Sequence, residues 1–313
     1  MKALVAAPQS EAKLEIREVA DPRPLSNEAL VRVRAFSLNR GELKAVTSAA
    51  DGFRPGWDVA GVVERAAADG SGPAEGSRVV GMVRSGAWAE LVAVPTRTLA
   101  ALPDPVSFED ASTLPIAGLT ALRCLEIGGP LLGKRVLVTG AAGGVGRFAI
   151  QLAHRAGAHV TGVIGRPERA AGLRELGCDE LVQRIDTDGP HFDLILESVG
   201  GSSLAAALHR VATGGTVVSF GNSSNEQTTF DVRPFFLRSR ATLYGFIIFE
   251  EVEHTPFAPR ALAYLASLVG SGALKTEVAS VRGWGEAAAS LAELKDRQVA
   301  GKAVLTIDSA SRD

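Results

Sequence analysis

A glycine-rich turn between an apolar strand and a helix-forming stretch constrains this chain more than any other feature. Residues 135–146 read Arg-Val-Leu-Val-Thr-Gly-Ala-Ala-Gly-Gly-Val-Gly, and a stretch with one apolar face follows over residues 147–156. A second apolar strand is expected at residues 159–164. Glycines permit positive φ and let the backbone approach a pyrophosphate, which then lies at the positive end of the helix. The pattern predicts a dinucleotide-binding βαβ unit, and a glycine-rich turn without a ligand is the alternative.

Strands and helices alternate from residue 134 onward. This alternation is typical of a parallel sheet that is covered by helices on both faces. The expected strands are 135–139, 159–164, 192–196, 215–220 and 241–248, and the expected helices are 145–156, 167–176 and 202–211. The backbone cradle of the turn is assigned to Gly140, Ala142, Gly143, Gly144, Val145 and Gly146.

The first third of the chain has a β pattern instead. Residues 29–36 alternate between apolar and charged side chains, as a half-buried strand does. Further short strands are expected at 2–5, 14–19, 59–63, 78–83 and 88–94, separated by glycine and proline turns, which favours a small barrel or sandwich. After it we expect helices at 116–127, 259–269 and 284–296 and a last strand at 302–307.

The last strand is expected to return to the first domain, so that domain is predicted to be discontinuous. The predicted organisation is a β-rich domain over residues 1–117, an α/β domain with a doubly wound parallel sheet over 118–251, and a return segment over 252–313. A length of 313 residues is consistent with two domains.

Composition excludes several classes of partner. With 33 basic against 35 acidic residues, the chain has no electrostatic footprint for nucleic acid or an anionic membrane. Two cysteines make no disulfide framework, which favours a reducing compartment. The apolar start is too short for a signal core and no window approaches eighteen apolar residues, so we expect a cytoplasmic protein.

Six sequence stretches, in the same order along the chain, resemble those of the medium-chain dehydrogenase/reductase superfamily. The similarity is greatest to the zinc-independent quinone oxidoreductase branch, which includes zeta-crystallin and the enoyl reductase domains of polyketide synthases. The stretches are 36–43, 55–63, 86–90, 117–121, 139–146 and 301–305. The resemblance implies a GroES-like barrel catalytic domain and a Rossmann domain, with nicotinamide held between them. It also implies homodimers that pair through the last Rossmann strand, here residues 242–249; an ordinary buried strand is the alternative.

The residues at the zinc positions of this superfamily differ from zinc ligands. Where zinc enzymes have a cysteine and a Gly-His-Glu, this chain has Ser37-Leu-Asn39 and Gly56-Trp57-Asp58. Because zinc needs three or four closely placed ligands, we expect no metal. Without a Lewis acid, oxidation of a simple alcohol lacks stabilisation of its alkoxide, whereas a conjugated acceptor spreads the charge that arrives with hydride. Reduction of quinones or enones is therefore favoured.

The end of the second Rossmann strand predicts the choice of cofactor. An acid there binds the adenosine ribose and repels a 2′-phosphate, but this chain has Gly165 followed by Arg166. An arginine can bind a phosphate with two parallel hydrogen bonds, so NADPH is favoured over NADH. Arg169 either assists or is a solvated charge, and Glu168, in the first turn of the expected helix, argues against this choice.

The resemblance also implies roles for single residues. Asn39 would hold a substrate carbonyl or the cofactor ribose, or else cap a loop. Independently of the resemblance, we expect Trp57 to line the pocket or belong to the core, and Arg40 to polarise a carbonyl or pair with a structural Asp58. Lys302 would lie near the cofactor, or else be a lysine of an edge strand. Further cofactor contacts are implied for Thr120, Gly221, Asn222, Phe246, Ile247 and Ile248.

These observations predict an NADPH-dependent, zinc-free oxidoreductase of quinones or α,β-unsaturated carbonyls. No side chain in the sequence is an obvious proton donor, so the enolate that follows hydride transfer would take its proton from water. Two alternatives stay open. One is a biosynthetic enoyl reductase of a polyketide-type pathway, and the other is a non-catalytic NADPH-binding redox sensor.

Overall fold

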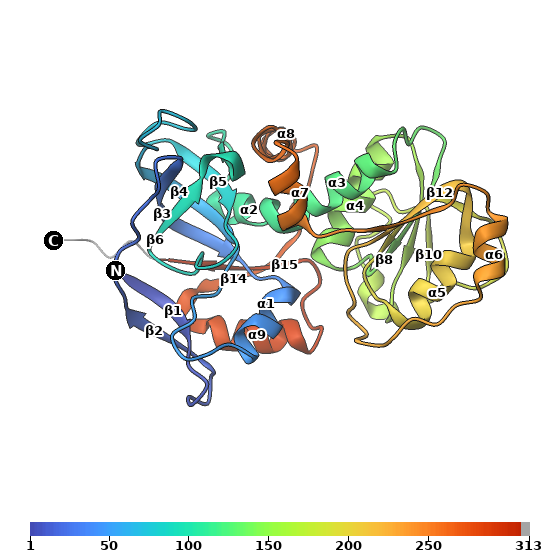
Figure 1. The fold of residues 1–313 in the computed structure, drawn as a ribbon, viewed down its shortest axis with the longest axis horizontal. Coiled ribbons are helices and arrows are strands. Elements are labelled where there is room, and N and C mark those ends of the chain that lie inside the picture. The colour runs from blue at the N-terminus through green and yellow to red at the C-terminus, as the bar shows by residue number, and fades with distance from the viewer. Residues whose placement is uncertain (308–313) are drawn as a thin grey trace. The chain divides into compact units, whose positions relative to one another are not determined.

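The computed structural model describes residues 1–307, which form two units (Figure 1). Unit 1 contains Met1–Leu119 and the chain from Val252 on, and unit 2 contains Thr120–Glu251. The α/β class is confirmed: unit 2 has a parallel sheet and unit 1 a separate, mostly antiparallel one. No helix among residues 1–307 is both long enough and apolar enough to cross a membrane.

The sheet of unit 1 is organised around one central strand. β3 pairs with β4, β6 and β15, and seven of its ten residues are buried. The sheet follows the order β14-β15-β3-β4-β5-β7, and only β14 and β15 run parallel. Its strands are β3 (Glu28–Ser37), β4 (Asp58–Arg65), β5 (Arg78–Met82), β6 (Leu91–Pro95), β7 (Leu99–Ala101), β14 (Val278–Gly283) and β15 (Lys302–Thr306), beside a hairpin of β1 (Lys2–Ala6) and β2 (Leu14–Glu18).

Alternation along β3 gives unit 1 its core. Val31 and Val33 are buried, while Arg32 points to the exposed face and its guanidinium binds Glu64 at 2.7 Å. Phe36 and Trp88 stack at 5.7 Å between ring centroids in the buried cluster. The helices of this unit are α1 (Arg40–Thr47), α2 (Phe108–Ser112), α8 (Ala258–Gly270) and α9 (Ala287–Lys295), with a π-helical turn at Leu114–Gly118 and 3-10 turns at Thr96–Thr98 and Trp284–Glu286. α7 (Ile248–His254) spans the boundary between the two units.

Unit 2 contains the doubly wound sheet that the glycine turn predicts. Its six strands are parallel in the order β10-β9-β8-β11-β12-β13. α4 packs on β8 and β9, and α5 packs on β11 and β12. The strands are β8 (Arg135–Thr139), β9 (His159–Val163), β10 (Glu180–Val182), β11 (Phe192–Glu197), β12 (Val211–Ser219) and β13 (Thr242–Gly245), and the helices are α3 (Leu119–Ile127), α4 (Gly144–Arg155), α5 (Gly201–Arg210) and α6 (Val232–Leu237).

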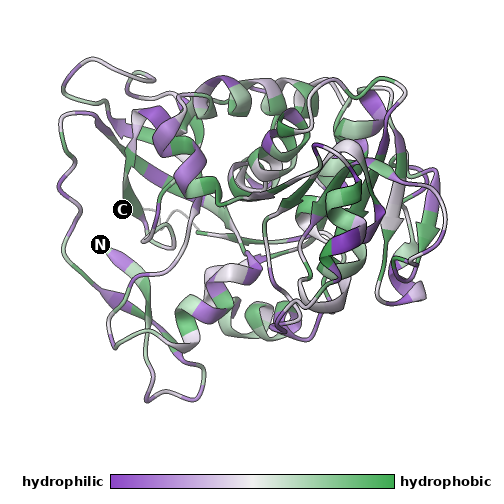
Figure 2. Cartoon of the chain, turned by 45° about the vertical axis from the view of Figure 1, so that its right-hand side comes forward, coloured by the Kyte–Doolittle hydropathy of each residue, from purple (hydrophilic) through white to green (hydrophobic). Residues whose placement is uncertain are grey.

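The direction of winding reverses between β8 and β11. From β8 the chain moves outward to β9 and β10, and from β11 it moves the other way to β12 and β13. Ligands of open α/β sheets bind at such a switch point, outside the carboxyl ends of the strands. The strands consist mainly of hydrophobic residues, drawn green in Figure 2, and many of them are buried in one core cluster. The glycine turn therefore follows a strand that is fixed by this core.

Two expectations from the sequence are wrong. Residues 167–176 form only a 3-10 turn at Pro167–Ala170 and further turns, because Gly172 has a φ of 77°, which an α-helix cannot contain. The strand expected at 241–248 ends at Gly245, where its pairing with β12 also ends, and Ile248 already begins α7. The helices α1, α2 and α6 were not foreseen, and neither were α7 and the strands β7, β10 and β14.

Candidate functional site

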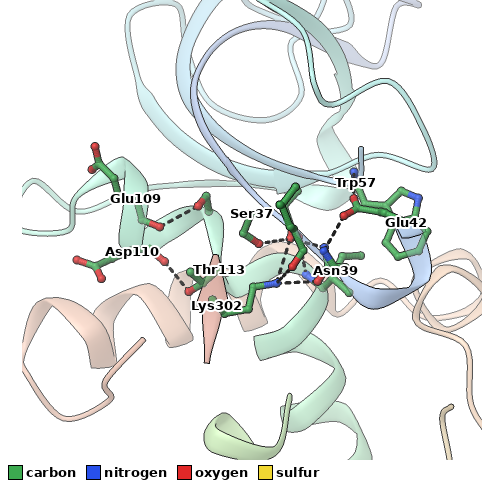
Figure 3. A network of polar contacts seen from close by, with 12 residues as sticks. Ser37, Asn39, Glu42, Trp57, Glu109, Asp110, Thr113 and Lys302 are labelled. Atoms are coloured by element: carbon green, nitrogen blue, oxygen red, sulfur yellow. Dashed lines mark hydrogen bonds and ion pairs between the residues drawn. The ribbon is translucent and has the colours of Figure 1, made fainter. Parts of the chain in front are cut away.

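A cluster of buried polar side chains lies where three strands and one helix of unit 1 meet (Figure 3). Ser37 ends β3, Asp58 begins β4 and Lys302 begins β15, while Asn39 and Glu42 come from the start of α1. Asp58, Glu42 and Ser37 have no exposed surface, Lys302 is 4% exposed and Asn39 is 8% exposed. Asn39 is therefore the most exposed of these five residues.

Asp58 is the acceptor at the centre of the cluster. Its Oδ2 accepts hydrogen bonds from Ser37 Oγ at 2.5 Å and from Asn39 Nδ2 at 2.7 Å, and its Oδ1 accepts one from the backbone N–H of Ile116 at 2.8 Å. Lys302 Nζ lies 3.7 Å from Oδ2 of the same carboxylate. Burial raises the pKa of Asp58, and the ammonium of Lys302 opposes that shift.

The contacts of Asn39 fix which way its amide faces. Lys302 Nζ donates to Asn39 Oδ1 at 2.7 Å and to the carbonyl of Leu38 at 3.0 Å. Asn39 Nδ2 donates to the carboxylate of Asp58. Because an ammonium can only donate and a carboxylate can only accept, the amide oxygen must face Lys302 and the amide nitrogen must face Asp58. One N–H of the amide remains for another partner, so Asn39 presents a donor at the edge of the cluster.

Glu42 holds the backbone around Asn39 in place. Its Oε2 accepts the N–H of Asn39 at 2.6 Å, as in a capping box, and its Oε1 accepts the N–H of Trp57 at 2.9 Å. Burial raises the pKa of Glu42, and the carboxylate of Asp58 adds to the shift. Burial also lowers the pKa of Lys302, while Asp58 and Glu42 oppose that change. The cluster thus combines two carboxyl groups with one ammonium away from water.

Two of the sequence-based interpretations in this unit, those of Arg40 and Lys302, need correction. Arg40 does not pair with Asp58, because its guanidinium donates to the carbonyl of Leu294 at 3.2 Å and Lys302 takes the place beside the aspartate. Burial, followed by the charge of Arg297, lowers the pKa of Arg40. Lys302 is not a lysine of an edge strand, because β15 lies between β14 and β3. Trp57 is half-buried against the start of α1, where a Cβ on Gly41 would lie 2.4 Å from its ring.

The glycine turn of unit 2 has the geometry of an anion cradle. Gly140 has a φ of 60°, and a Cβ on Gly146 would lie 2.5 Å from the carbonyl oxygen of Gly140, so neither position accepts a larger residue without strain. Gly143 is the N-cap of α4, and no acidic residue lies in the first turn of that helix. The positive end of α4, with Gly144, Val145 and Gly146 in its first turn, therefore has no carboxylate of its own helix beside it.

A buried acid that sequence reasoning missed ends β11 at the switch point. Glu197 ends β11 and accepts the N–H groups of Val199 at 2.9 Å and Gly200 at 3.0 Å, and Ser203 Oγ at 2.9 Å. Thr139 Oγ1, at the end of β8, accepts the N–H of Ser198 at 2.8 Å. Burial raises the pKa of Glu197. An acid that ends an apolar strand just before Gly200-Gly201 is the signal that could have identified it.

A hollow of about 580 Å³ opens near the carboxyl ends of these strands. Gly221 and Asn222, both predicted cofactor contacts, line it, and a Cβ on Gly221 would lie 3.0 Å from the carbonyl oxygen of Ser198. The other lining residues are Gly200, Leu204, Ser219, Asn225, Glu226, Gln227 and Thr228. The hollow is therefore formed by the segments that follow β11 and β12.

The segment after β9 contains the residues predicted to recognise the adenosine end of the cofactor. Gly165 and Arg166 are exposed, and Arg169 is half-buried in the 3-10 turn that replaces the expected helix. Arg147, buried in α4, donates to the carbonyl of Ala171 at 3.1 Å and so connects this segment to the glycine turn. Sequence reasoning missed this contact because it joins two elements through a single side chain.

The remaining predicted residues lie in three places in unit 2. Phe246 follows β13 and its N–H donates to the carbonyl of Ser219 at 2.9 Å. Ile247 is 60% exposed, whereas Ile248 is buried at the start of α7. Thr120 is buried in α3, and Ala142 is buried in the glycine turn. Within residues 1–307, no group of three or more His, Cys, Asp or Glu side chains is placed to hold a metal ion.

Comparisons with known proteins place the chain in a family. Residues 25–104 match the model of the alcohol dehydrogenase GroES-like domain, and residues 144–266 match that of the zinc-binding dehydrogenase. The chain is 30% identical over 315 residues to the quinone oxidoreductase of Pseudomonas aeruginosa, covering 93% of this chain and 95% of that one. It is 30% identical over 285 residues to prostaglandin reductase-3 of Bos taurus, covering 84% of this chain and 74% of that one.

A solved structure agrees with these matches along the whole chain. The mycobacterial protein Rv1454c, in complex with NADPH, is 25% identical and superposes with a TM-score of 0.86, covering 98% of this chain and 100% of that one. Members of this family bind nicotinamide cofactors. The chain therefore belongs to the medium-chain dehydrogenase/reductase superfamily, in its zeta-crystallin-like quinone oxidoreductase branch, and it is an oxidoreductase of that family.

Proposed function

We propose that this protein is an NADPH-dependent reductase that transfers hydride to a quinone or an α,β-unsaturated carbonyl without a metal ion. One observation carries the proposal: the uncompensated N-terminus of α4 at the switch point is followed, after β9, by exposed Arg166 in place of an acid. A pyrophosphate fits the first feature and a 2′-phosphate fits the second. The names of the quinone oxidoreductase and prostaglandin reductase relatives agree with this type of chemistry.

The residues of the turn fit the diphosphate of such a cofactor. Gly143, Gly144 and Gly146 carry no side chain that would stand between the backbone and a pyrophosphate. A Cβ on Gly146 would also meet the carbonyl oxygen of Gly140. Arg166 would donate to the 2′-phosphate, and Gly221 and Asn222 would contact the nicotinamide end from the hollow beside β12. When bound, NADPH supplies hydride from its dihydronicotinamide ring.

The polar cluster of unit 1 supports a reaction without zinc. Asp58 already accepts three hydrogen bonds, and the ammonium of Lys302 supplies positive charge beside it. The neighbouring side chain, Trp57, has an indole N–H that can donate but cannot ligate a metal. In this proposal Asn39 donates its remaining N–H to the carbonyl oxygen of the acceptor, which stabilises the negative charge that develops there. The enolate then takes its proton from water.

Stopped-flow oxidation of NADPH by a panel of quinones and enones tests the proposal. We expect NADPH to bind more tightly than NADH and to be oxidised only when a conjugated acceptor is added. Tight binding without any acceptor-dependent oxidation would contradict the proposed activity and favour a redox sensor. Activity that depends on stoichiometric added zinc would contradict the metal-free reaction.

A second candidate function is that of a biosynthetic enoyl reductase. The chain is 32% identical over 235 residues to the highly reducing polyketide synthase apmlA of Arthrinium phaeospermum, a match that covers 68% of this chain and 10% of that much longer protein. An enoyl thioester would then be reduced with a higher kcat/KM than any small quinone. The opposite order of kcat/KM would favour the quinone or enone reductase.

We also propose that two copies of the chain pair through β13. β13 is the edge strand of its sheet, and the neighbouring side chains Leu243 and Ile247 are 45% and 60% exposed. An unpaired strand edge with exposed apolar residues favours pairing with another strand. Sedimentation should show a dimer that Leu243→Asp converts to a monomer, whereas Leu132→Asp, at an 84% exposed leucine of the same unit, should leave it intact. A monomeric wild-type protein would contradict the proposal.

A further inference from the structure

A second hollow in unit 2 lies at the other end of the sheet, away from the glycine turn. Its volume is about 280 Å³, and it is lined by His209, Asp231, Arg233, Pro234, Leu237 and Arg238. His209 is in the last turn of α5, just before β12 begins at Val211. The hollow therefore lies toward the amino ends of the strands, whereas Thr139 and Glu197 mark the carboxyl ends where the cofactor is expected.

The polar side chains around this hollow have unused donors. Among residues 1–307, the side chains of Arg233, Arg238 and His209 make no hydrogen bond or ion pair with another residue. Nε of Arg238 and Nδ1 of His209 are buried nitrogen atoms without a partner. A buried polar atom left unpaired destabilises the protein, so such atoms favour a partner that is bound at least part of the time.

The electrostatic surroundings of the hollow favour an anion. Asp231 is its only acidic lining residue, and its Oδ1 already accepts the N–H of Arg233 at 2.9 Å as the N-cap of α6. Next to the hollow, His191 precedes β11, and burial, followed by the charges of Arg238, Arg210 and His209, lowers its pKa. A neutral imidazole is thus held in a region of positive potential.

Arg210 and Arg135 add positive charge that neighbouring groups neutralise only partly. The guanidinium of Arg210 donates to the carbonyls of Asp188 at 2.7 Å and Pro190 at 3.0 Å, and it lies 5.4 Å from the ring centroid of Phe192. Arg135 lies 5.6 Å from the centroid of the same ring. Within the described part of the chain, neither guanidinium makes an ion pair with a carboxylate, although the nearby Asp186 and Asp188 act on Arg210.

We propose that this hollow binds a phosphate group, with Arg233 and Arg238 as guanidinium donors and His209 Nδ1 as a third donor. Guanidinium groups match the oxygens of a phosphate with paired hydrogen bonds, and a dianion satisfies several donors at once. Pro234 and Leu237 give the hollow an apolar side that would accept a short carbon chain next to the phosphate. The ligand is therefore inorganic phosphate or a phosphomonoester, at a site separate from the cofactor cradle.

Proton NMR of the histidines tests this proposal directly. The full chain is titrated with inorganic phosphate or with an aliphatic phosphomonoester at constant ionic strength, and chloride serves as the control anion. We expect saturable shifts of the His209 and His191 ring signals with phosphate and no shift with chloride. Arg233→Gln and Arg238→Gln should each weaken binding about tenfold, because each removes a charge-assisted hydrogen bond. The tighter of the two ligands identifies the source of the phosphate.

A matched control separates this site from general attraction of anions. Arg184 is an 85% exposed arginine of the same unit that pairs with Asp186, and Arg184→Gln should leave the phosphate affinity unchanged. Shifts that never saturate, or equal weakening by Arg184→Gln and Arg238→Gln, would overturn the proposal. The same would follow if saturating NADPH displaced phosphate from His209, because the hollow would then not be separate from the cofactor site.

Discussion

The polar cluster of unit 1 is held by side-chain contacts, whereas the glycine turn of unit 2 takes its shape from the backbone. In the cluster, Asp58, Asn39 and Lys302 are held by side-chain contacts between strands, and one of these joins residues that are 263 positions apart in the sequence. In the turn, the shape comes from the backbone: Gly140 has positive φ, and Gly146 packs directly on the carbonyl oxygen of Gly140. The cluster therefore depends on charge balance, and the turn depends on the absence of side chains.

This difference predicts different responses to mutation. Removal of one charge from the cluster leaves others buried without compensation, so stability should fall first. A methyl group added to the turn should disturb ligand binding as well as packing, because the affected backbone is the part expected to contact the cofactor. The predictions below test this contrast in order of decreasing effect.

Lys302→Met should destabilise unit 1 by about 3–5 kcal/mol, because it leaves the carboxylate of Asp58 buried without its cation. Urea unfolding measured by intrinsic fluorescence gives the free energy of unfolding. The matched control is Arg32→Met, which removes the cation of the exposed pair with Glu64 on β3 and should cost no more than about 1 kcal/mol. Equal losses in the two variants would mean that burial of the Lys302 charge is unimportant.

Gly146→Ala should destabilise unit 2 by about 1–3 kcal/mol and weaken NADPH binding about tenfold or more. The new Cβ would lie 2.5 Å from the carbonyl oxygen of Gly140, so the turn has to open. Calorimetry and NADPH fluorescence measure the two effects. Gly283→Ala, at the end of β14, is the control, because a Cβ there meets nothing within 4 Å and its φ is not positive. If Gly146→Ala bound NADPH with unchanged affinity, the turn would not be the cradle.

Arg166→Gln should weaken NADPH binding roughly tenfold to a hundredfold and leave NADH binding unchanged. The reason is that Arg166 is expected to contact only the 2′-phosphate, which NADH lacks. Isothermal titration with both cofactors measures the preference. Arg155→Gln, at an exposed arginine of the last turn of α4, is the control and should change neither affinity. A parallel loss of NADH affinity in Arg166→Gln would argue against recognition of the 2′-phosphate.

The same contrast explains what the sequence could predict. The strand at 135–139 and the turn after it are local patterns, and the structure confirms that strand as β8. The cluster could not be predicted, because no spacing in the sequence shows that Lys302 approaches Asn39. Arg40 was one candidate partner for Asp58, whereas its guanidinium donates to the carbonyl of Leu294, 254 positions away.

Local patterns also fail where a glycine interrupts them. Residues 167–176 look helical from composition, but the left-handed conformation of Gly172 prevents a continuous helix. α1 was missed for the opposite reason. Its start, Arg40-Gly-Glu-Leu-Lys44, lacks a clear apolar period, and the helix is fixed at that end by the hydrogen bonds of Glu42 to the N–H groups of Asn39 and Trp57. Hydrogen bonds of a buried side chain therefore decide the start of α1, whereas the conformation of a single glycine decides the structure of residues 167–176.

The smallest effect concerns pH. Burial raises the pKa of Glu42 above its ordinary value of 4.5, so from pH 4.5 upward to the raised pKa the folded state binds more protons than the unfolded state. This carboxyl group therefore makes the free energy of unfolding fall as pH rises through that window. Glu42→Gln cannot ionise and lacks this decline, although its amide can accept only one of the two backbone N–H groups.

Glu42→Gln should therefore be less stable than the wild type near pH 4.5, and the difference should narrow by about 1 kcal/mol per pH unit as the pH rises. Urea unfolding of both proteins across this range measures it, and Glu11→Gln, at an exposed glutamate, should parallel the wild type. A constant difference would mean that the Glu42 carboxyl group keeps the same charge in both states. The cluster would then tolerate a second buried carboxylate beside Asp58 with Lys302 as their shared cation, and its stability would rest on hydrogen bonds rather than on charge balance.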